Sequence, residues 1–207
     1  MNLLKPMPGL RLLATSQARP LDLSPEGQRG MALDNDGVHE RVLGPLWREI
    51  IAARQASRPG STPKPEPTVK SRQWVIDADA IDLGVLAAQR ALDAAGMRAG
   101  ELSAIICATS TPPLISASMA SRIVRQLGAD EGLSNPLCFD VRAGGVGVLA
   151  AWFTAQGLIA QGAQPVLIIA AEAASAFMAP DDLGSALLYG DGAAACILAG
   201  PQEGQAL

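Results

Sequence analysis

The chain has 207 residues, of which 49% are hydrophobic and only 3% aromatic, and its formal net charge is −4 at pH 7. This length allows one sizeable core, and the aliphatic composition is typical of helices packed on a buried sheet. No basic stretch is dense enough for a nucleic-acid partner and no apolar run reaches the roughly 18 residues of a membrane span, so we expect a cytoplasmic protein.

Residues 1–76 are interrupted by many prolines and predict few regular elements. A short apolar run at 10–15 favours a strand, and the pattern at 46–56 predicts a helix. The segment 57–70, SRPGSTPKPEPTVK, has the composition of an exposed linker. We expect the one histidine, His39, in a solvent-facing loop. Residues 1–76 are interpreted as a strand and a Pro-rich insertion that belong to the same domain as the rest.

Residues 77–207 alternate between helical and strand-like patterns and predict the core of the domain. Helices are predicted from 77 to a stop at Gly96, at 116–127 and at 146–161. Strands are predicted at 102–108, 137–141, 166–171 and 193–199. Together with the run at 10–15 these make five strands with intervening helices, which predicts an α/β fold with a largely parallel, layered sheet.

All three cysteines, Cys107, Cys138 and Cys196, fall inside the apolar strand-like runs. Cysteine is among the most frequently buried residue types, so we expect three buried thiols. Their spacing does not fit a metal site. The sequence therefore predicts neither a bound metal nor a cofactor.

Four short strings then suggest a family, because their order and spacing resemble those of β-ketoacyl-acyl-carrier-protein synthase III, a condensing enzyme of the thiolase superfamily. They are ATS at 108–110, FDV at 139–141, PDD at 180–182 and YGDGA at 189–193. The resemblance extends from about 77 to 200. It implies a thiolase-like half, the N-terminal one, with a five-stranded mixed sheet and helices on both faces.

The resemblance places the family's nucleophilic cysteine four residues after Val141, where this chain has Gly145. A decarboxylating condensation needs a thiolate at a helix N-terminus, and glycine supplies none. The family's catalytic histidine and asparagine belong to the other half. We therefore expect this chain alone to be inactive in condensation.

Two interpretations of the turn formed by Arg142, Gly144, Gly145 and Val146 stay open. Its backbone N–H groups suit an oxyanion, a thioester carbonyl or a phosphate, or the glycines simply make a tight turn. A second turn, Gly190, Asp191 and Gly192, is interpreted as structural, with Asp191 fixing it through local hydrogen bonds.

Family members dimerise through the strand before the nucleophile turn. That strand is here Leu137, Cys138, Phe139, Asp140 and Val141. An uncovered edge strand makes such pairing physically sensible. The preceding loop resembles one that reaches into the partner's acyl pocket, although packing within its own subunit stays an alternative; its candidate residues are Pro112, Pro113, Leu114 and Ile115.

Three hypotheses for function follow from this pattern. The first is a non-catalytic subunit, in a homo- or heterodimer, of a condensing acyltransferase in fatty-acid or polyketide-type biosynthesis. The second is a stand-alone protein that binds acyl-CoA, another acyl thioester or acyl carrier protein. The third is a truncated remnant of a synthase III.

Overall fold

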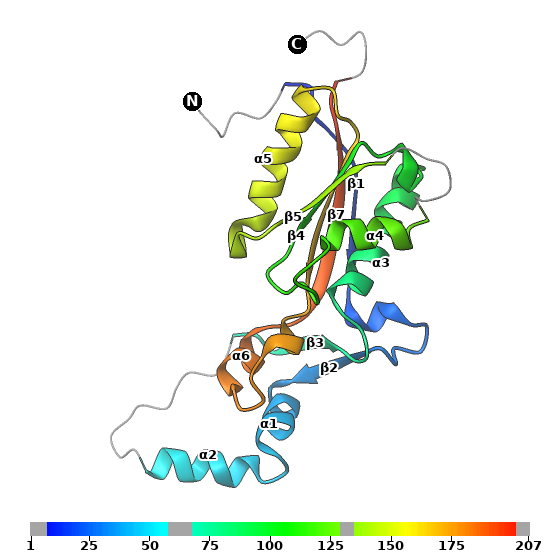
Figure 1. Ribbon diagram of the computed structural model, residues 1–207. Helices are drawn as coiled ribbons and strands as arrows, with labels where there is room; N and C mark the ends of the chain where they lie inside the picture. The colour runs from blue at the N-terminus through cyan, green and yellow to red at the C-terminus, as the bar shows by residue number, and fades with distance from the viewer. Residues whose placement is uncertain (1–7, 58–67, 129–134, 202–207) are drawn as a thin grey trace.

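A five-stranded mixed sheet forms the centre of the computed structural model, which describes residues 8–57, 68–128 and 135–201 (Figure 1). The strand order is β1-β7-β6-β4-β5, and β4 runs parallel to both β5 and β6. The bounds are β1 (Arg11–Ala18), β4 (Ala104–Ala108), β5 (Leu137–Val141), β6 (Val166–Glu172) and β7 (Gly192–Ala199). The predicted five-stranded mixed sheet is confirmed.

Four of the five strands run in the same direction, so the prediction of a largely parallel sheet is confirmed; the exception is β7, which runs antiparallel to both β6 and β1. A parallel connection needs a crossover, usually a helix, that carries the chain back along the sheet. The segment between β6 and β7 contains a short 3-10 helix and the six-residue α6 (Leu183–Leu188). The chain therefore re-enters the sheet from the end at which it left.

Helices cover both faces of the sheet, as predicted, but unequally (Figure 1). The helices α3 (Ala80–Ala95) and α4 (Met119–Gln126) lie on one face, and α5 (Gly147–Ala160) lies alone on the other. Strand β4 is buried throughout: Ile105 and Cys107 pack in the α3/α4 cluster, whereas Ala104, Ile106 and Ala108 pack in the α5 cluster. This alternation follows from the period of two in a strand.

Helix α3 is the longest element, and local signals fix both of its ends. Asp79 caps its start, where the carboxylate accepts the N–H groups of Ile81 at 2.7 Å and Asp82 at 3.2 Å. Gly96 ends it in the left-handed conformation with φ 65°. Gly84 lets α4 come close, since a Cβ there would lie 2.7 Å from Ile123 Cδ1.

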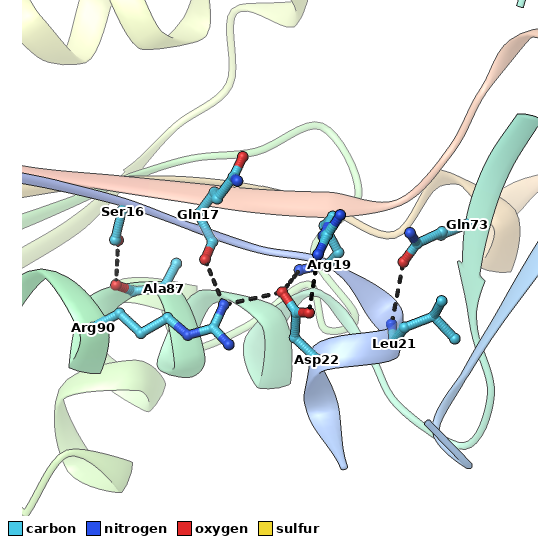
Figure 2. A network of polar contacts seen from close by, with 8 residues as sticks. All are labelled: Ser16, Gln17, Arg19, Leu21, Asp22, Gln73, Ala87 and Arg90. Atoms are coloured by element: carbon cyan, nitrogen blue, oxygen red, sulfur yellow. Dashed lines mark hydrogen bonds and ion pairs between the residues drawn. The ribbon is translucent and has the colours of Figure 1, made fainter. Parts of the chain in front are cut away.

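A polar network ties the end of β1 to α3 (Figure 2). The Arg90 guanidinium donates to Gln17 O at 2.8 Å and to Asp22 Oδ2 at 3.0 Å. The Arg19 N–H donates to the same Asp22 oxygen at 3.0 Å, and Ser16 Oγ donates to the Ala87 carbonyl. The first strand is therefore joined to the core by pairing with β7 and by side-chain hydrogen bonds.

A smaller unit lies beyond one end of the sheet and contains elements that the sequence did not predict. The strands β2 (Gly30–Asp34) and β3 (Ser71–Val75) form an antiparallel pair, and α1 (Asn35–Leu43) follows β2. The predicted helix at 46–56 is confirmed as α2 (Trp47–Ala56). The linker predicted at 57–70 lies mostly outside the described residues.

The placement of His39 in a loop is wrong. His39 lies half-buried in α1, where its Nδ1 is 2.7 Å from the Asn35 carbonyl and its ring stacks on Trp47 with centroids 4.6 Å apart. The capping signal was in the sequence: the Asp34 carboxylate accepts the Gly37 N–H at 2.8 Å and starts the helix. No helix among the described residues is long and apolar enough to span a bilayer.

Candidate functional site

The turn between β5 and α5 has the backbone of a strand–turn–helix site. A short 3-10 helix, Gly144–Val146, joins Val141 to the first residue of α5, Gly147. Gly144 has φ +53°, a conformation that side chains disfavour. Gly145 is exposed, and a Cβ built on it meets nothing within 4 Å. The position therefore has room for a side chain that it does not carry.

The start of α5 carries no side-chain chemistry of its own. No side chain caps the helix at Val146, and the 3-10 helix before it already pairs two N–H groups, that of Val146 with Ala143 O at 3.3 Å and that of Gly147 with Gly144 O. The helix dipole favours negative charge at this end. Arg142 and Val146 flank the turn and are both exposed. Gly145 gives no atom that attacks a thioester.

A cavity of about 530 Å³ lies beside this turn. Gly144 and Gly145 form part of its wall, and the exposed rings of Phe177 and Tyr189 form another part. The remaining lining residues are Ser110, Thr111, Glu172, Ala174, Met178, Ala179, Asp182, Ser185 and Gly190. Apolar walls with a few polar groups are typical of small-molecule sites.

Glu172 at the end of β6 is a cavity residue that sequence reasoning missed. Its Oε1 accepts the Ser110 N–H at 2.7 Å, and its Oε2 accepts the hydroxyl of Thr111. Thr111 Oγ1 in turn accepts the Ala173 N–H at 2.9 Å. Glu172 therefore positions the loop that follows β4. A carboxylate directly after an apolar strand was the available signal.

The loop that begins at Thr111 is anchored at both ends and exposed in the middle. Pro112 and Pro113 are half-buried, whereas Leu114 is 44% exposed and Ile115 is 98% exposed. At the far end the Asp140 carboxylate accepts backbone N–H groups at the start of α4, from Met119 at 2.6 Å and Ala120 at 2.9 Å. The tip thus presents apolar side chains to the outside of the chain.

Strand β5 lies at one edge of the sheet, beside that loop. It pairs with β4 alone, with Leu137 opposite Ala104 and Val141 opposite Ala108. Leu137 is 53% exposed, and Cys138, Phe139, Asp140 and Val141 are half-buried. The structure therefore brings the predicted edge strand and the predicted loop together through Asp140.

The turn at Gly190–Gly192 is held by distant residues, so the prediction that Asp191 makes local hydrogen bonds is wrong. The Asp191 carboxylate accepts the Val75 N–H at 2.9 Å, the Ser175 N–H at 2.9 Å and the Ser175 hydroxyl. The Asp191 N–H donates to Gln73 O at 2.9 Å. The residue joins β3, the segment after β6 and the start of β7.

The three thiols lie in strands, as predicted, but only Cys107 is buried, while Cys138 and Cys196 are half-buried. Burial raises the pKa of Cys107, and the charges of Asp140 and Glu172 raise it further. Burial also raises the pKa of Cys138, with a contribution from Asp140, and raises the pKa of Cys196 to about 11. Each thiol is therefore held protonated and is a poor nucleophile.

Within residues 8–57, 68–128 and 135–201, no group of three or more His, Cys, Asp or Glu side chains is placed to hold a metal ion. The family model for 3-oxoacyl-[acyl-carrier-protein] synthase III matches residues 139–207, a segment that contains both glycine turns. The chain is synthase III-like.

Relatives of known name agree with this assignment. The synthase III-like chain is 42% identical over 118 residues to β-ketoacyl-[acyl-carrier-protein] synthase III of Paracoccus denitrificans, covering 56% of this chain and 35% of that protein. It is 39% identical over 139 residues to the protein of the same name from Caulobacter vibrioides, covering 66% of this chain and 42% of that protein.

Solved structures show the same fold along nearly the whole synthase III-like chain. The 3-oxoacyl-[acyl-carrier-protein] synthase III of Aquifex aeolicus superposes with a TM-score of 0.72 at 26% identity, covering 94% of this chain and 55% of that one. The enzyme of Pseudomonas aeruginosa gives 0.71 at 25% identity, covering 95% and 53%. The chain thus spans about half the length of these solved relatives, and the prediction of a thiolase-like half is confirmed.

Proposed function

We propose that this chain is a non-catalytic subunit that pairs with an active synthase III-type condensing enzyme in fatty-acid or polyketide-type biosynthesis. The observation that carries the proposal is Gly145. It sits in an open turn at the start of a helix, where the resemblance predicts the nucleophilic cysteine. A chain with the scaffold of the site and no nucleophile is suited to support the chemistry of another chain.

Two surfaces support pairing with such an enzyme. Among the described residues only β4 pairs with β5, and an edge strand of this kind favours the addition of a strand from another sheet. Beside it, Glu172 and Asp140 hold a loop whose apolar tip, Leu114 and Ile115, lies in solvent. A partner strand at the β5 edge would bring its own subunit within reach of this loop.

Co-expression with a cysteine-bearing synthase III from the same genome tests the pairing. Native mass spectrometry should detect a heterodimer, and condensation by the mixture should depend on the partner's cysteine. Leu137→Asp adds a charge to the β5 edge and should weaken the heterodimer at least tenfold. Leu46→Asp is the matched control, since Leu46 is 63% exposed against 53% for Leu137. A chain that never associates with such enzymes contradicts the proposal.

The cavity beside Gly145 favours a second candidate, a protein that binds an acyl thioester, as acyl-CoA or on acyl carrier protein, without reacting with it. The apolar wall suits an acyl chain, and the N–H groups of the turn suit a thioester carbonyl. Calorimetry with acyl-CoA and with acyl carrier protein should give heat for wild type. Gly145→Phe should remove it, and Gly157→Phe should not, because both positions are open and only Gly145 lines the cavity. Absence of heat with both ligands contradicts this candidate.

A further inference from the structure

The charged groups in the wall of the cavity beside Gly145 all have the same sign. Two carboxylates, those of Glu172 and Asp182, belong to the wall, and among the described residues no lysine, arginine or histidine lines it. Arg142 is the basic residue nearest to the turn in the sequence, and it is exposed without lining the cavity. The described residues therefore give this cavity a net negative charge.

The carboxylate of Glu172 is fixed by the loop after β4. Its Oε1 accepts the Ser110 N–H at 2.7 Å, and its Oε2 accepts the hydroxyls of Thr111 and, at 3.5 Å, Thr109. All three partners are donors, as an ionised carboxylate requires, because it can only accept hydrogen bonds. In the described part of the chain no basic side chain forms an ion pair with Glu172. Its negative charge is therefore not compensated there.

The carboxylate of Asp182 lies at the start of α6. Its Oδ1 accepts the Ser185 N–H at 3.0 Å, and its Oδ2 accepts the Ser185 hydroxyl at 2.6 Å. These hydrogen bonds hold the pKa of Asp182 below its usual value, so the side chain is ionised at pH 7. Asp182 also has no ion-pair partner among the described residues. The wall thus carries two uncompensated negative charges.

The apolar part of the wall makes these charges matter for a bound ligand. The rings of Phe177 and Tyr189 are 59% and 51% exposed, and Met178 and two alanines also line the cavity. Such a wall displaces water from an acyl chain, and like charges repel more strongly where water is excluded. An acyl chain that ends in a methyl group experiences no such repulsion. A chain that ends in a carboxylate is repelled and also loses its own hydration.

We propose that Glu172 and Asp182 make this cavity select acyl thioesters with an uncharged acyl group and reject those whose acyl chain ends in a carboxylate. The inference rests on the second candidate function, the binding of an acyl thioester, and adds which acyl groups the cavity takes. Specificity of this kind comes from an unfavourable contact with the wrong ligand, and it needs no additional contact with the right one.

Calorimetry of the full chain with hexanoyl-pantetheine and adipoyl-pantetheine tests the selection. The two thioesters differ only in a terminal methyl group against a carboxylate, and neither carries the phosphates of CoA. Wild type should bind the adipoyl thioester about tenfold more weakly, or worse. Asp182→Asn removes one charge and keeps a side chain that caps helices well, so it should reduce this ratio of dissociation constants about threefold. Glu172→Gln should change the ratio in the same direction.

Asp181→Asn is the matched control, because Asp181 is exposed, adjoins Asp182 and does not line the cavity. Its ratio should equal that of wild type, so the comparison isolates the charge of Asp182 from any other group that borders the cavity.

The possible results separate the inference from the function on which it rests. Equal dissociation constants of wild type for the two thioesters, or equal ratios in Asp182→Asn and Asp181→Asn, overturn the inference and leave acyl-thioester binding intact. Absence of hexanoyl-pantetheine binding contradicts the second candidate function and the inference with it. In about 1 M salt the wild-type ratio should fall, because salt screens the repulsion by the exposed Asp182. A ratio that does not change with salt would assign the rejection to lost hydration and overturn the role of the carboxylates.

Discussion

Two glycine-containing turns of this molecule differ in how many contacts they make with distant parts of the chain. At Gly190–Gly192 the Asp191 carboxylate and N–H bind Val75, Ser175 and Gln73, residues from two distant segments. At Gly144–Val146 the backbone hydrogen bonds are local, such as that from the Val146 N–H to Ala143 O, and a Cβ on either Gly144 or Gly145 meets nothing within 4 Å. The first turn holds elements together, and the second leaves space beside a helix end.

The difference shows where this fold depends on particular side chains. Removing Asp191 would leave buried or half-buried donors of two segments without an acceptor, which costs free energy throughout the unit around β3. Changing Gly145 touches no other residue. A side chain at position 145 should therefore change the reactivity or binding of the turn, with little effect on the stability of the fold.

The largest loss of stability is expected from a change in the turn Gly190–Gly192. Asp191→Ala should lower the free energy of unfolding by about 3 kcal/mol, because three donors lose a charged acceptor. Chemical denaturation measures this. Asp182→Ala is the control, since that carboxylate accepts hydrogen bonds from Ser185 within the exposed start of its own helix, α6, and its loss should cost much less. Equal losses would remove the distinction between the two turns.

A smaller effect is expected within the open turn. Gly144→Ala should destabilise the chain by about 1 kcal/mol, because alanine disfavours the positive φ of 53°. Gly145→Ala should be neutral or slightly stabilising, because no positive φ and no neighbour opposes it. Thermal unfolding of the two variants gives the comparison. A large loss in Gly145→Ala would mean that the turn is not open in solution.

Because the turn at Gly145 is open, a cysteine placed there should add a reactive thiol with little change in stability. Gly145→Cys should shift the free energy of unfolding by less than about 0.5 kcal/mol, within the range of surface substitutions. The new thiol lies at a helix N-terminus, which lowers the pKa of a thiol, so it should be alkylated faster than the native cysteines and accept an acyl group from acyl-CoA.

Mass spectrometry should find one acyl group per Gly145→Cys chain and no condensation product. The matched control is Gly157→Cys, an equally open position in the last turn of α5, away from the helix N-terminus. Its thiol should be alkylated at an ordinary rate and should not be acylated. Equal acylation of the two variants would show that exposure alone, and not the helix end, determines the reaction.

The smallest effect is expected at Asp22, which like Asp191 joins distant segments but has more exposed partners (Figure 2). Burial by itself would raise the pKa of Asp22, but hydrogen bonds from Arg90 and Arg19, with their charges, outweigh it and the pKa is lowered. The contribution to stability is thus present above the unfolded pKa of about 4 and is lost as the pH falls through the lower folded pKa.

Asp22→Asn should therefore reduce the free energy of unfolding at pH 7 by less than about 1 kcal/mol, as for partly exposed ion pairs. The difference from wild type should shrink as the pH falls through the folded pKa of Asp22, because the protonated carboxyl is then neutral like the amide. Denaturation over a series of pH values from 7 downward measures it. A difference that is independent of pH would assign the effect to packing and not to charge.

Local patterns were sufficient to predict the strands of the five-stranded sheet and the position of the turn before α5. The strand at 137–141 and the helix that follows it were predicted almost to the residue, because an apolar run, a glycine pair and a second apolar run mark their limits. The unit with β2, β3 and α1 was missed. Its strands are separated by more than 35 residues that include two helices, so no local hairpin signal exists.

Glu172 and Asp191 mark the limit of sequence reasoning about the candidate site. Glu172 was not singled out from the sequence and Asp191 was given only a local role, yet Glu172 binds a backbone group more than 60 residues away and Asp191 one more than 100 residues away. Which donors such a carboxylate meets depends on how β3, β4, β6 and β7 come together. Short-range spacing carries no information about that.

The sequence by itself determined that the turn before α5 has glycine at position 145 and thus no nucleophile, since this follows from residue identity alone. It also determined the α/β class, because hydrophobic periodicity is a local property. Only the tertiary structure decided that β7 reverses, that Asp191 joins distant segments and that one face of the sheet carries a single uncharged helix. Those features arise from packing between elements far apart in the chain, which no local pattern specifies.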